Sequence, residues 1–158
     1  MKTLRLLFGV LIAGLIGAAV PARADNEDVP YWASLRADEA YMRVGPSDSY
    51  KIDWVYRRKM LPMKVLRREG PWRFVIDPDG TKGWMRDLLL SRERSAMVVG
   101  EGPTEMRARA SVGSPLLWRI EAGVVGKLGD CVDGWCELDV DGHKGFAPQD
   151  RLWGPGEP

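Results

Sequence analysis

The sequence predicts an all-β protein in which one small β-domain is built twice, after an N-terminal export signal. The octet DPDGTKGW at residues 77–84 returns 62 residues later as DVDGHKGF at residues 139–146. Turn-forming Asp-Gly and Gly-Pro pairs separate short runs rich in aromatic and β-branched residues. Neither copy sustains a helical period. A repeat this long, carried by glycines, tryptophans and hairpin turns, indicates a duplicated domain.

The first 24 residues have the composition of a signal peptide. A basic start at residues 1–5 precedes 15 apolar or small residues at 6–20, and Ala22-Arg23-Ala24 fits a small-x-small cleavage site. The apolar run is shorter than the ~20 residues that a membrane-spanning helix needs. No other stretch comes close, so we expect no membrane span in the mature chain. An uncleaved N-terminal anchor is the alternative; in both cases the remaining chain is exported, to the periplasm or outside the cell.

Turn signals divide the mature chain into two barrels of about 60 residues. Residues 25–36 are acidic and show no clear period, which favours a lead-in segment; the barrels are expected over 37–95 and 96–158. The expected strands are 41–44, 53–57, 63–66, 72–77 and 81–86 in the first copy, and 106–108, 117–120, 124–128, 135–140 and 144–147 in the second. Five short strands separated by turns are typical of a small closed or nearly closed barrel. The Asp-Gly pairs at 79–80 and 141–142 each predict a two-residue type I′ hairpin turn. The connector at 92–103 is short and not rich in Gly or Ser, so we expect the barrels to lie close together.

The charge balance argues against a nucleic-acid partner. Cleavage after residue 24 would leave 20 basic and 22 acidic residues, a net charge of −2. The two copies differ, however. Residues 37–95 hold 13 basic and 9 acidic residues, whereas residues 96–158 hold 6 and 10. The asymmetry either orients the copies against each other, draws the first toward an anionic partner, or is ordinary solvated surface charge.

The cysteines and the single histidine carry little catalytic signal. Cys131 and Cys136 match neither a C-x-x-C redox motif nor a zinc site, and in an exported protein the default is a disulfide, here across the Asp133-Gly134 turn. Free thiols are the alternative. His143 follows a hairpin tip, where an exposed polar side chain is the ordinary interpretation. We therefore expect no catalytic residue and no cofactor.

Calcium binding by the paired aspartates of the octets is also not expected. On the EF-hand template, position twelve falls on Arg86 in the first copy and on Pro148 in the second, where the template needs glutamate. Asp-Gly is ordinary turn chemistry. The sequence thus predicts no metal site.

Residues 42–50, MRVGPSDSY, with Gly70-Pro71-Trp72 and Gly83-Trp84-Met85, resemble the bacterial SH3-like domains, small β-barrels of exported bacterial proteins. The resemblance covers about residues 37–154. It implies two tandem SH3-like β-barrels and a role in binding cell-wall peptide. The second copy is a looser match, because residues 108–110 read Ala-Arg-Ala in place of the Gly-Pro-Ser turn. Any site on that loop is therefore expected in the first copy.

Aromatic and basic residues of the first copy are the candidates for binding. In SH3-like barrels an aromatic groove beside the long first loop receives an extended peptide. The candidate ligand-binding residues are Arg43, Tyr50, Trp54, Trp72 and Trp84. The candidate patch for an anionic partner comprises Arg57, Arg58, Lys59, Arg67 and Arg68, whose guanidinium forks suit carboxylate or phosphate. The opposing interpretations are that the tryptophans form the core and that the basic residues are a solvated rim.

The function that these observations favour is a non-enzymatic exported binding or scaffolding module that recognises cell-wall peptide or another envelope component. One alternative is a protein–protein adaptor that positions an envelope enzyme through the basic copy. A third hypothesis is a hydrolase that uses His143.

Overall fold

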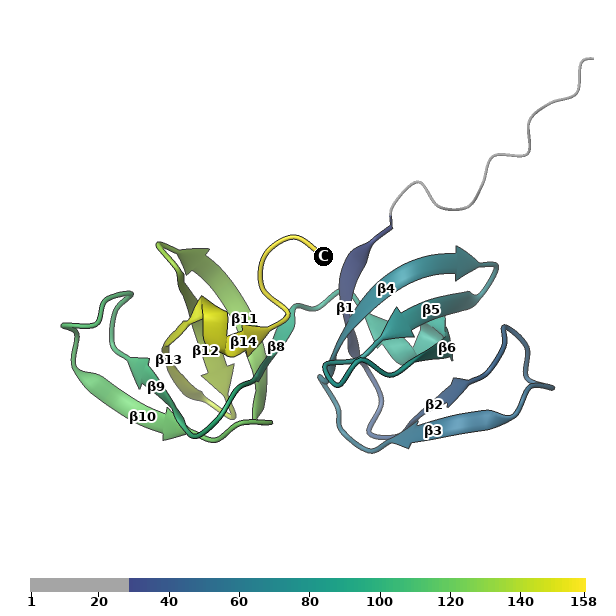
Figure 1. The fold of residues 1–158 in the computed structure, drawn as a ribbon, viewed down its shortest axis with the longest axis horizontal. Coiled ribbons are helices and arrows are strands. Elements are labelled where there is room, and N and C mark those ends of the chain that lie inside the picture. The colour runs from purple at the N-terminus through teal and green to yellow at the C-terminus, as the bar shows by residue number, and fades with distance from the viewer. Residues whose placement is uncertain (1–28) are drawn as a thin grey trace, which may run out of the picture.

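The computed structural model describes residues 29–158, which form two seven-stranded antiparallel sheets, each curled around its own core (Figure 1). The strands of the first sheet are β1 Tyr31–Leu35, β2 Ala40–Arg43, β3 Ile52–Tyr56, β4 Pro62–Glu69, β5 Trp72–Ile76, β6 Lys82–Arg86 and β7 Leu90–Ser91. Those of the second are β8 Ser95–Val98, β9 Thr104–Arg107, β10 Leu116–Ile120, β11 Val125–Val132, β12 Trp135–Val140, β13 His143–Pro148 and β14 Leu152–Trp153. Two short 3₁₀ turns, η1 Asp87–Leu89 and η2 Gln149–Arg151, precede the last strand of each sheet.

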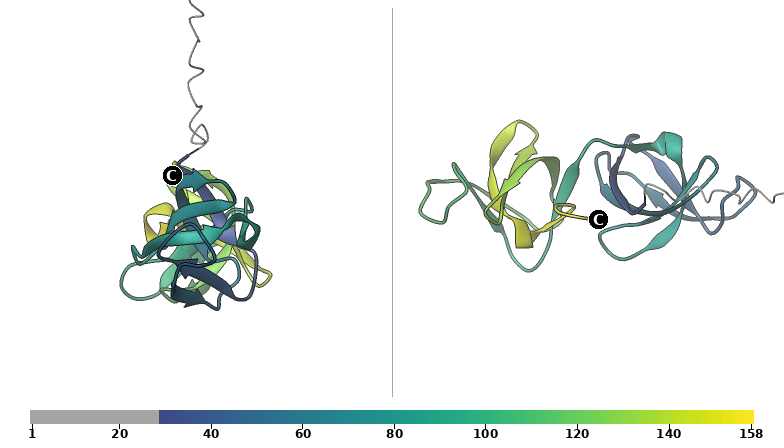
Figure 2. Two further views of the ribbon diagram at one scale, coloured as in Figure 1. Left: turned by 90° about the vertical axis from the view of Figure 1, so that its right-hand side faces the viewer. Right: turned by 90° about the horizontal axis from the view of Figure 1, so that it is seen from above.

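The two sheets have the same strand order, which confirms the predicted duplication. The first runs β3-β2-β6-β5-β4-β1-β7, and the second runs β10-β9-β13-β12-β11-β8-β14, with each strand seven places later in the chain. Figure 2 shows the two barrels side by side. Within residues 29–158 no helix is long and apolar enough to cross a membrane. The predicted signal peptide, residues 1–24, lies outside the described residues and stays a prediction.

Each copy begins with a strand that the sequence analysis did not expect. β1 lies in the stretch interpreted as a lead-in; it pairs with β4 and β7. Its counterpart β8 lies in the expected connector. Ala33, Ser34 and Leu35 are all buried, so β1 has no alternation of apolar and polar residues that would reveal a strand. The Ser34 hydroxyl donates to the Glu93 carbonyl at 2.8 Å, so the start of the connector is bonded to this strand.

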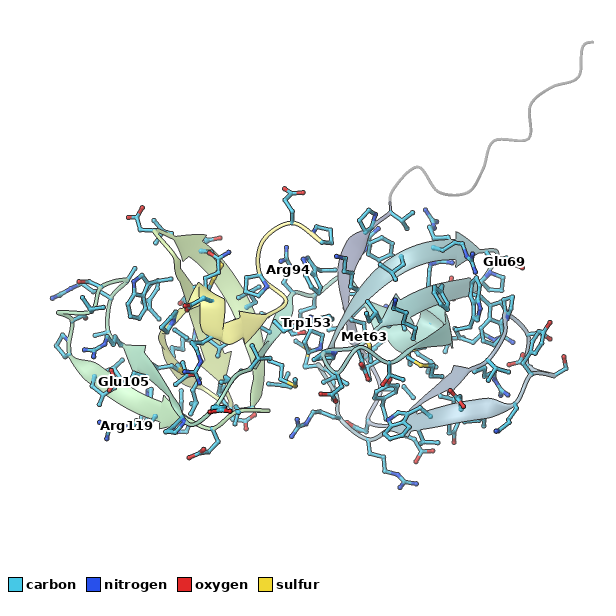
Figure 3. All side chains as sticks on the ribbon, in the orientation of Figure 1. Met63, Glu69, Arg94, Glu105, Arg119 and Trp153 are labelled. Atoms are coloured by element: carbon cyan, nitrogen blue, oxygen red, sulfur yellow. A yellow bond between two sulfur atoms is a disulfide. The ribbon has the colours of Figure 1, made fainter. Side chains whose placement is uncertain are left out.

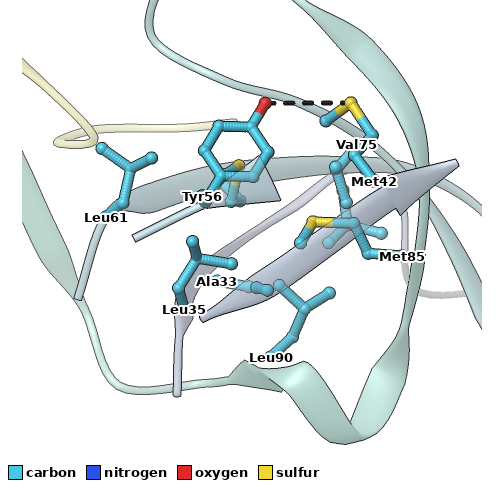
Figure 4. Close-up of a cluster of buried hydrophobic side chains, with 11 residues drawn as sticks. Ala33, Leu35, Met42, Tyr56, Leu61, Val75, Met85 and Leu90 are labelled. Carbon is cyan, nitrogen blue, oxygen red and sulfur yellow. Dashed lines mark hydrogen bonds between the residues drawn. The ribbon is translucent and has the colours of Figure 1, made fainter. Parts of the chain in front are cut away.

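The cores of the two barrels differ in size. The first contains eleven buried apolar residues, eight of them labelled in Figure 4, including Met42, Met85 and Tyr56. The second contains eight. Cys136, one of those eight, is bonded to Cys131 across the Asp133-Gly134 turn, which confirms the predicted disulfide. The smaller core is thus the one that has a covalent cross-link.

A repeated glycine allows two strands to cross closely in each barrel. A Cβ atom on Gly83 would lie 2.4 Å from Cγ of Met42 and 3.0 Å from the carbonyl oxygen of Arg43. Gly145 has the same relation to Met106 and to the carbonyl of Arg107, at 3.2 and 3.1 Å. The glycine of the repeated Lys-Gly-aromatic sequence is therefore required by packing of β6 on β2 and of β13 on β9.

The two Asp-Gly turns differ, although their sequences match. Asp141 and Gly142 both have positive φ, +52° and +88°, as a type I′ turn requires, and Val140 pairs with His143. In the first copy only Gly80 has positive φ, and Ile76 pairs with Lys82 across a longer loop. The type I′ prediction is therefore confirmed at residues 141–142 and wrong at 79–80. Pro78 explains the difference, because a proline lacks the N–H that the residue flanking a two-residue turn would contribute to the ladder.

The barrels contact each other through the start and the end of the described chain. The indole of Trp32 packs edge-on against Trp153, with ring centroids 4.7 Å apart, and its Nε1 donates to the carbonyl of Gly156 at 3.0 Å. Trp153 and the C-terminal segment lie between the barrels in Figure 3. On another part of the interface, Arg58 donates to the carbonyl of Gly123 at 2.6 Å. The expectation that the copies lie close together is confirmed.

Candidate functional site

Arg43 holds the long loop of the first barrel in place. Its Nη1 donates to the carbonyl of Tyr50 at 2.6 Å, and its Nη2 lies 3.9 Å from the carboxylate of Asp48. Arg107 makes the matching bond to the carbonyl of Ser114 at 2.7 Å. The repeated Met-Arg pair therefore closes the loop after the second strand of each barrel. As a ligand-binding residue Arg43 stays a prediction.

Tyr50 and Trp54 are the predicted ligand-binding aromatics that solvent reaches. Tyr50 is half-exposed, and its ring lies against Gly45, where a Cβ atom would be only 2.6 Å from the ring. Trp54 is 55% exposed and lies on β3, the edge strand of the sheet. Its ring centroid is 6.4 Å from that of Tyr56. An exposed indole on an edge strand offers both an apolar surface and free backbone groups to a ligand.

Trp72 and Trp84 occupy a position that was not foreseen. Both are nearly fully buried, yet neither belongs to the barrel core. They lie on the outer face of β5 and β6 beneath arginines. Cζ of Arg67 is 4.9 Å from the Trp84 ring centroid, and Cζ of Arg86 is 5.1 Å from that of Trp72. Cation–π contacts of this kind stabilise the outer face of the sheet; as ligand-binding residues both tryptophans stay predictions.

The basic residues predicted as one patch are distributed over different surroundings. Arg57 pairs with Glu39 at 3.0 Å, and Arg58 bonds to the second barrel. Lys59 borders a separate hollow between the barrels. Arg67 stacks on Phe74 and Trp84. Its neighbour Arg68 lies near the end of β4, in register with Arg73 of β5.

One hollow brings Trp54 together with two of these arginines. It has a volume of about 390 Å³ and is open to solvent. Its walls are formed by Trp54, Val55, Arg57, Arg58, Pro78, Asp79 and Met97, among others. Met97 comes from β8 of the second copy, so this hollow lies where the two barrels meet. Its hairpin wall at 78–79 and the contribution of Met97 were missed, because only the approach of distant segments brings them beside β3.

The carboxylate of Glu39 partly offsets the charge of this site. A hydrogen bond from the hydroxyl of Tyr41, and a second from Arg57, hold the pKa of Glu39 below its ordinary value. Glu39 is therefore ionised at neutral pH and neutralises Arg57 locally. Arg58 donates one N–H to the carbonyl of Gly123. It keeps further donors, since a guanidinium carries five N–H groups. Asp77 and Asp79 also line the hollow, so a ligand there would meet a guanidinium with free donors beside two carboxylates.

His143 and the cysteines lack the surroundings of a hydrolase centre. The His143 ring packs edge-on against Trp118, with centroids 4.5 Å apart, and its Nδ1 lies 3.2 Å from the carbonyl of Val140. Both cysteines are in the disulfide, so neither is a thiol nucleophile. Within residues 29–158 no group of three or more His, Cys, Asp or Glu side chains is placed to hold a metal ion.

Comparison with solved structures finds several distant similarities. NlpC2 from Trichomonas vaginalis shares 13% identity, with a TM-score of 0.37, over 80% of this chain and 48% of that one. NlpC1 from Trichomonas vaginalis shares 12%, with a TM-score of 0.37, over 92% and 51%. An NlpC/P60 family protein from Bacillus cereus ATCC 10987 shares 11%, with a TM-score of 0.36, over 78% and 56%. The chain spans about half the length of these three proteins.

Comparison with curated proteins finds no match. A family model does match, and it matches twice. The model described as "Bacterial SH3 domain" covers residues 36–92 and 101–154, which is most of the chain. These two segments correspond to the two barrels, apart from the strands β1 and β8 that precede each match. Two tandem barrels with the same strand order, each matched by one family model, place this chain in the bacterial SH3 domain family.

Proposed function

We propose that this protein is a non-enzymatic binding module of the cell envelope, and that it recognises cell-wall peptide through the hollow beside Trp54. The observation that carries the proposal is the exposed indole of Trp54 on an edge strand, next to Arg57 and Arg58. The family membership supports the choice of ligand, since bacterial SH3 domains are binding domains found in envelope proteins. The disulfide supports an exported location, because disulfides persist in oxidising compartments.

The edge strand and the guanidinium of Arg58 suit an extended peptide that carries a carboxylate, and the aspartates of the same hollow, Asp77 and Asp79, suit a cationic group beside it. The free edge of β3 can pair with a peptide backbone, as in other β-strand additions. The Trp54 ring supplies an apolar surface for a small side chain, and the guanidinium of Arg58 supplies a fork for a carboxylate. Met97 closes the site from the second barrel, so both copies are needed to form it.

Co-sedimentation with purified sacculi tests this function. The full mature chain is expected to leave the supernatant, and a Trp54→Ala variant to be retained several-fold less. Trp118→Ala is the matched control: Trp118 lies on β10, the equivalent edge strand of the second copy, and is 42% exposed. Failure of the unaltered chain to sediment at any salt concentration would refute the proposal, and equal losses in both variants would refute the assignment of the site.

The adaptor hypothesis has one observation in its favour. The hairpin of β2 and β3 exposes Tyr41 and Val55, which are cross-strand partners on the face opposite Trp54, and such apolar side chains suit a protein surface. Pull-down from a periplasmic extract discriminates the two functions. An adaptor would recover a stoichiometric protein partner and would be indifferent to sacculi.

A further inference from the structure

A second hollow, of about 150 Å³, lies on the first barrel between β1, β5, η1 and β7. Three arginines line it, Arg36, Arg73 and Arg92, together with one acidic residue, Asp87. Tyr31, Ala33 and Leu90 complete an apolar wall. Three guanidiniums and one carboxylate in so small a space give the hollow a net positive charge. None of the residues that line it belongs to the site beside Trp54.

Arg73 is the unusual member of this group, because it is only 8% exposed. Its Nη1 donates to the carbonyls of Gly70 and Trp72, at 2.7 and 2.8 Å. Its Nη2 reaches only the carboxylate of Asp87, at 3.4 Å, which is long for a charged hydrogen bond. A buried charge is costly unless it is paired and hydrogen-bonded. The guanidinium of Arg73 therefore has donor capacity that the described chain does not fill.

The other two arginines line the same hollow as this buried charge. Cζ of Arg92 lies 3.4 Å from the ring centroid of Tyr31, so the stacked guanidinium is held over the aromatic wall. The backbone N–H of Arg36 is bonded to the carbonyl of Leu89, which sets the start of its side chain beside η1. The structure shows no ion pair for the Arg36 side chain within residues 29–158. Two guanidiniums thus remain available to an incoming anion.

The second copy shows that the fold does not require these charges. Equivalent positions in the two copies are identified from the strand register. Matching backbone bonds agree with it: the N–H of Arg36 donates to the carbonyl of Leu89 at 2.9 Å. In the second copy the N–H of Val99 donates to the carbonyl of Arg151, also at 2.9 Å. All four positions are uncharged in the second copy, where Arg36, Arg73, Asp87 and Arg92 are replaced by Val99, Cys136, Gln149 and Gly154. The same backbone geometry therefore exists without charge at these four positions, although Arg151 and Arg94 donate to the carbonyls of Val99 and Gly154 there.

We propose that this hollow binds the C-terminal carboxylate of a peptide whose last residue has a small apolar side chain. The planar fork of a guanidinium matches the two oxygens of a carboxylate, and two such forks face the hollow beside the buried one. The partly exposed ring of Tyr31, next to the buried Ala33 and Leu90, supplies an apolar contact for a methyl side chain. The volume suits a group of this size, since cavities of about 150 Å³ hold a molecule as large as benzene.

Titration of the purified mature chain with N-acetylalanylalanine, followed by ¹H–¹⁵N NMR, tests the proposal. Shifts are expected at Ala33, Ser91 and the Nε–H of Arg36, and the C-terminal amide of the same dipeptide is expected to bind at least tenfold more weakly. Inorganic phosphate serves as the second probe. Equal binding of the amide, or of phosphate, would overturn the assignment of a peptide carboxylate.

Three variants sharpen the result without altering the buried Arg73. Arg36→Gln is expected to weaken binding about tenfold, whereas Arg109→Gln, an exposed arginine of the second copy, is expected to leave it unchanged. Asp87→Asn is expected to strengthen binding several-fold, because it removes the anion that competes for Arg73. Unchanged affinity in Arg36→Gln would overturn the proposal. The site does not rest on the proposed function, so loss of sacculus binding in Trp54→Ala and failure of this titration are distinguishable.

Discussion

Replacing Tyr56 by phenylalanine removes a single oxygen atom from the interior of the first barrel. Tyr56 is buried, and its hydroxyl donates to Oδ2 of Asp77 at 2.9 Å. Asp77 is also buried; its Oδ1 accepts from the backbone N–H groups of Asp79 and Thr81, at 3.0 and 2.7 Å. The carboxylate therefore holds the hairpin loop and the tyrosine together. The substitution leaves Oδ2 without this donor.

The expected loss follows from the kind of hydrogen bond that is removed. A hydrogen bond to a charged group contributes about 1.5–3 kcal/mol, and a buried acceptor left unsatisfied loses the larger part of that range. We therefore expect Tyr56→Phe to lower the free energy of unfolding of the first barrel by about 2 kcal/mol. A domain of this size has little stability in reserve, so the loss is a substantial fraction of the total.

Urea unfolding at pH 7, followed by tryptophan fluorescence, measures the loss. Tyr41→Phe is the control, because the Tyr41 hydroxyl donates to Glu39 at the exposed surface and its removal is expected to leave the midpoint unchanged. A Tyr56→Phe midpoint equal to that of the unaltered protein would refute the reasoning. So would a loss of the same size in Tyr41→Phe.

The pH dependence supplies an independent check. Burial, and then the hydrogen bond to Asp77, raises the pKa of Tyr56 far above its ordinary value. In the unfolded chain this tyrosine ionises near pH ~10. Its contribution to stability is therefore complete below pH ~10 and decreases above it, by about 1.4 kcal/mol for each pH unit. The stability difference between the unaltered protein and Tyr56→Phe should narrow between pH 10 and 11; a constant difference would contradict the assignment.

Three further predictions concern packing, the disulfide and the contact between the barrels. Gly83→Ala should cost about 1–3 kcal/mol in urea unfolding, because the new Cβ has no room beside Met42; an unchanged midpoint would contradict the close crossing. Replacing both Cys131 and Cys136 by alanine should lower the stability of the second barrel by about 2 kcal/mol or less, because the closed loop is short, and should abolish the effect of a reductant on its thermal midpoint. A larger loss would show that the chain-entropy account is incomplete. Trp32→Ala should increase the radius of gyration measured by small-angle X-ray scattering, because it removes both the ring contact and the bond to the C-terminal segment; an unchanged radius would show that other contacts hold the barrels together.

The tryptophans show the limits of prediction from sequence most clearly. From the sequence, these tryptophans are compatible with a place in the barrel core and with a place in a ligand-binding groove. Trp54 is exposed on an edge strand, whereas Trp72 and Trp84 lie on the outer face of the sheet beneath Arg86 and Arg67. Which face of a strand is covered depends on side chains from other strands. Alternation along one strand cannot distinguish an aromatic under an arginine from one in the core.

The binding surfaces show the same limit. The Trp54 hollow needs Met97 from the second copy, and the arginine hollow needs residues 31–36 and 87–92 beside β5. The sequence does not show that Arg73 is buried. It is the one charged residue in a strand of aromatic and β-branched residues, and a charged residue in such a strand is ordinarily expected to face solvent. The absence of charge at the equivalent positions of the second copy becomes visible only when the register of both sheets is known.

The sequence by itself determined the duplication, most of the strands, the type I′ turn at residues 141–142 and the disulfide. The duplication follows from two matching octets 62 residues apart. The strands, the turn and the disulfide each depend on a few neighbouring residues, such as an Asp-Gly pair or two cysteines across a turn, so that information is local. Only the tertiary structure decided that β1 and β8 complete the barrels, that Arg73 is a buried charge and that Arg43 closes a loop. Those outcomes depend on contacts between segments up to tens of residues apart, because burial and charge pairing are properties of the packed chain and not of any one stretch of it.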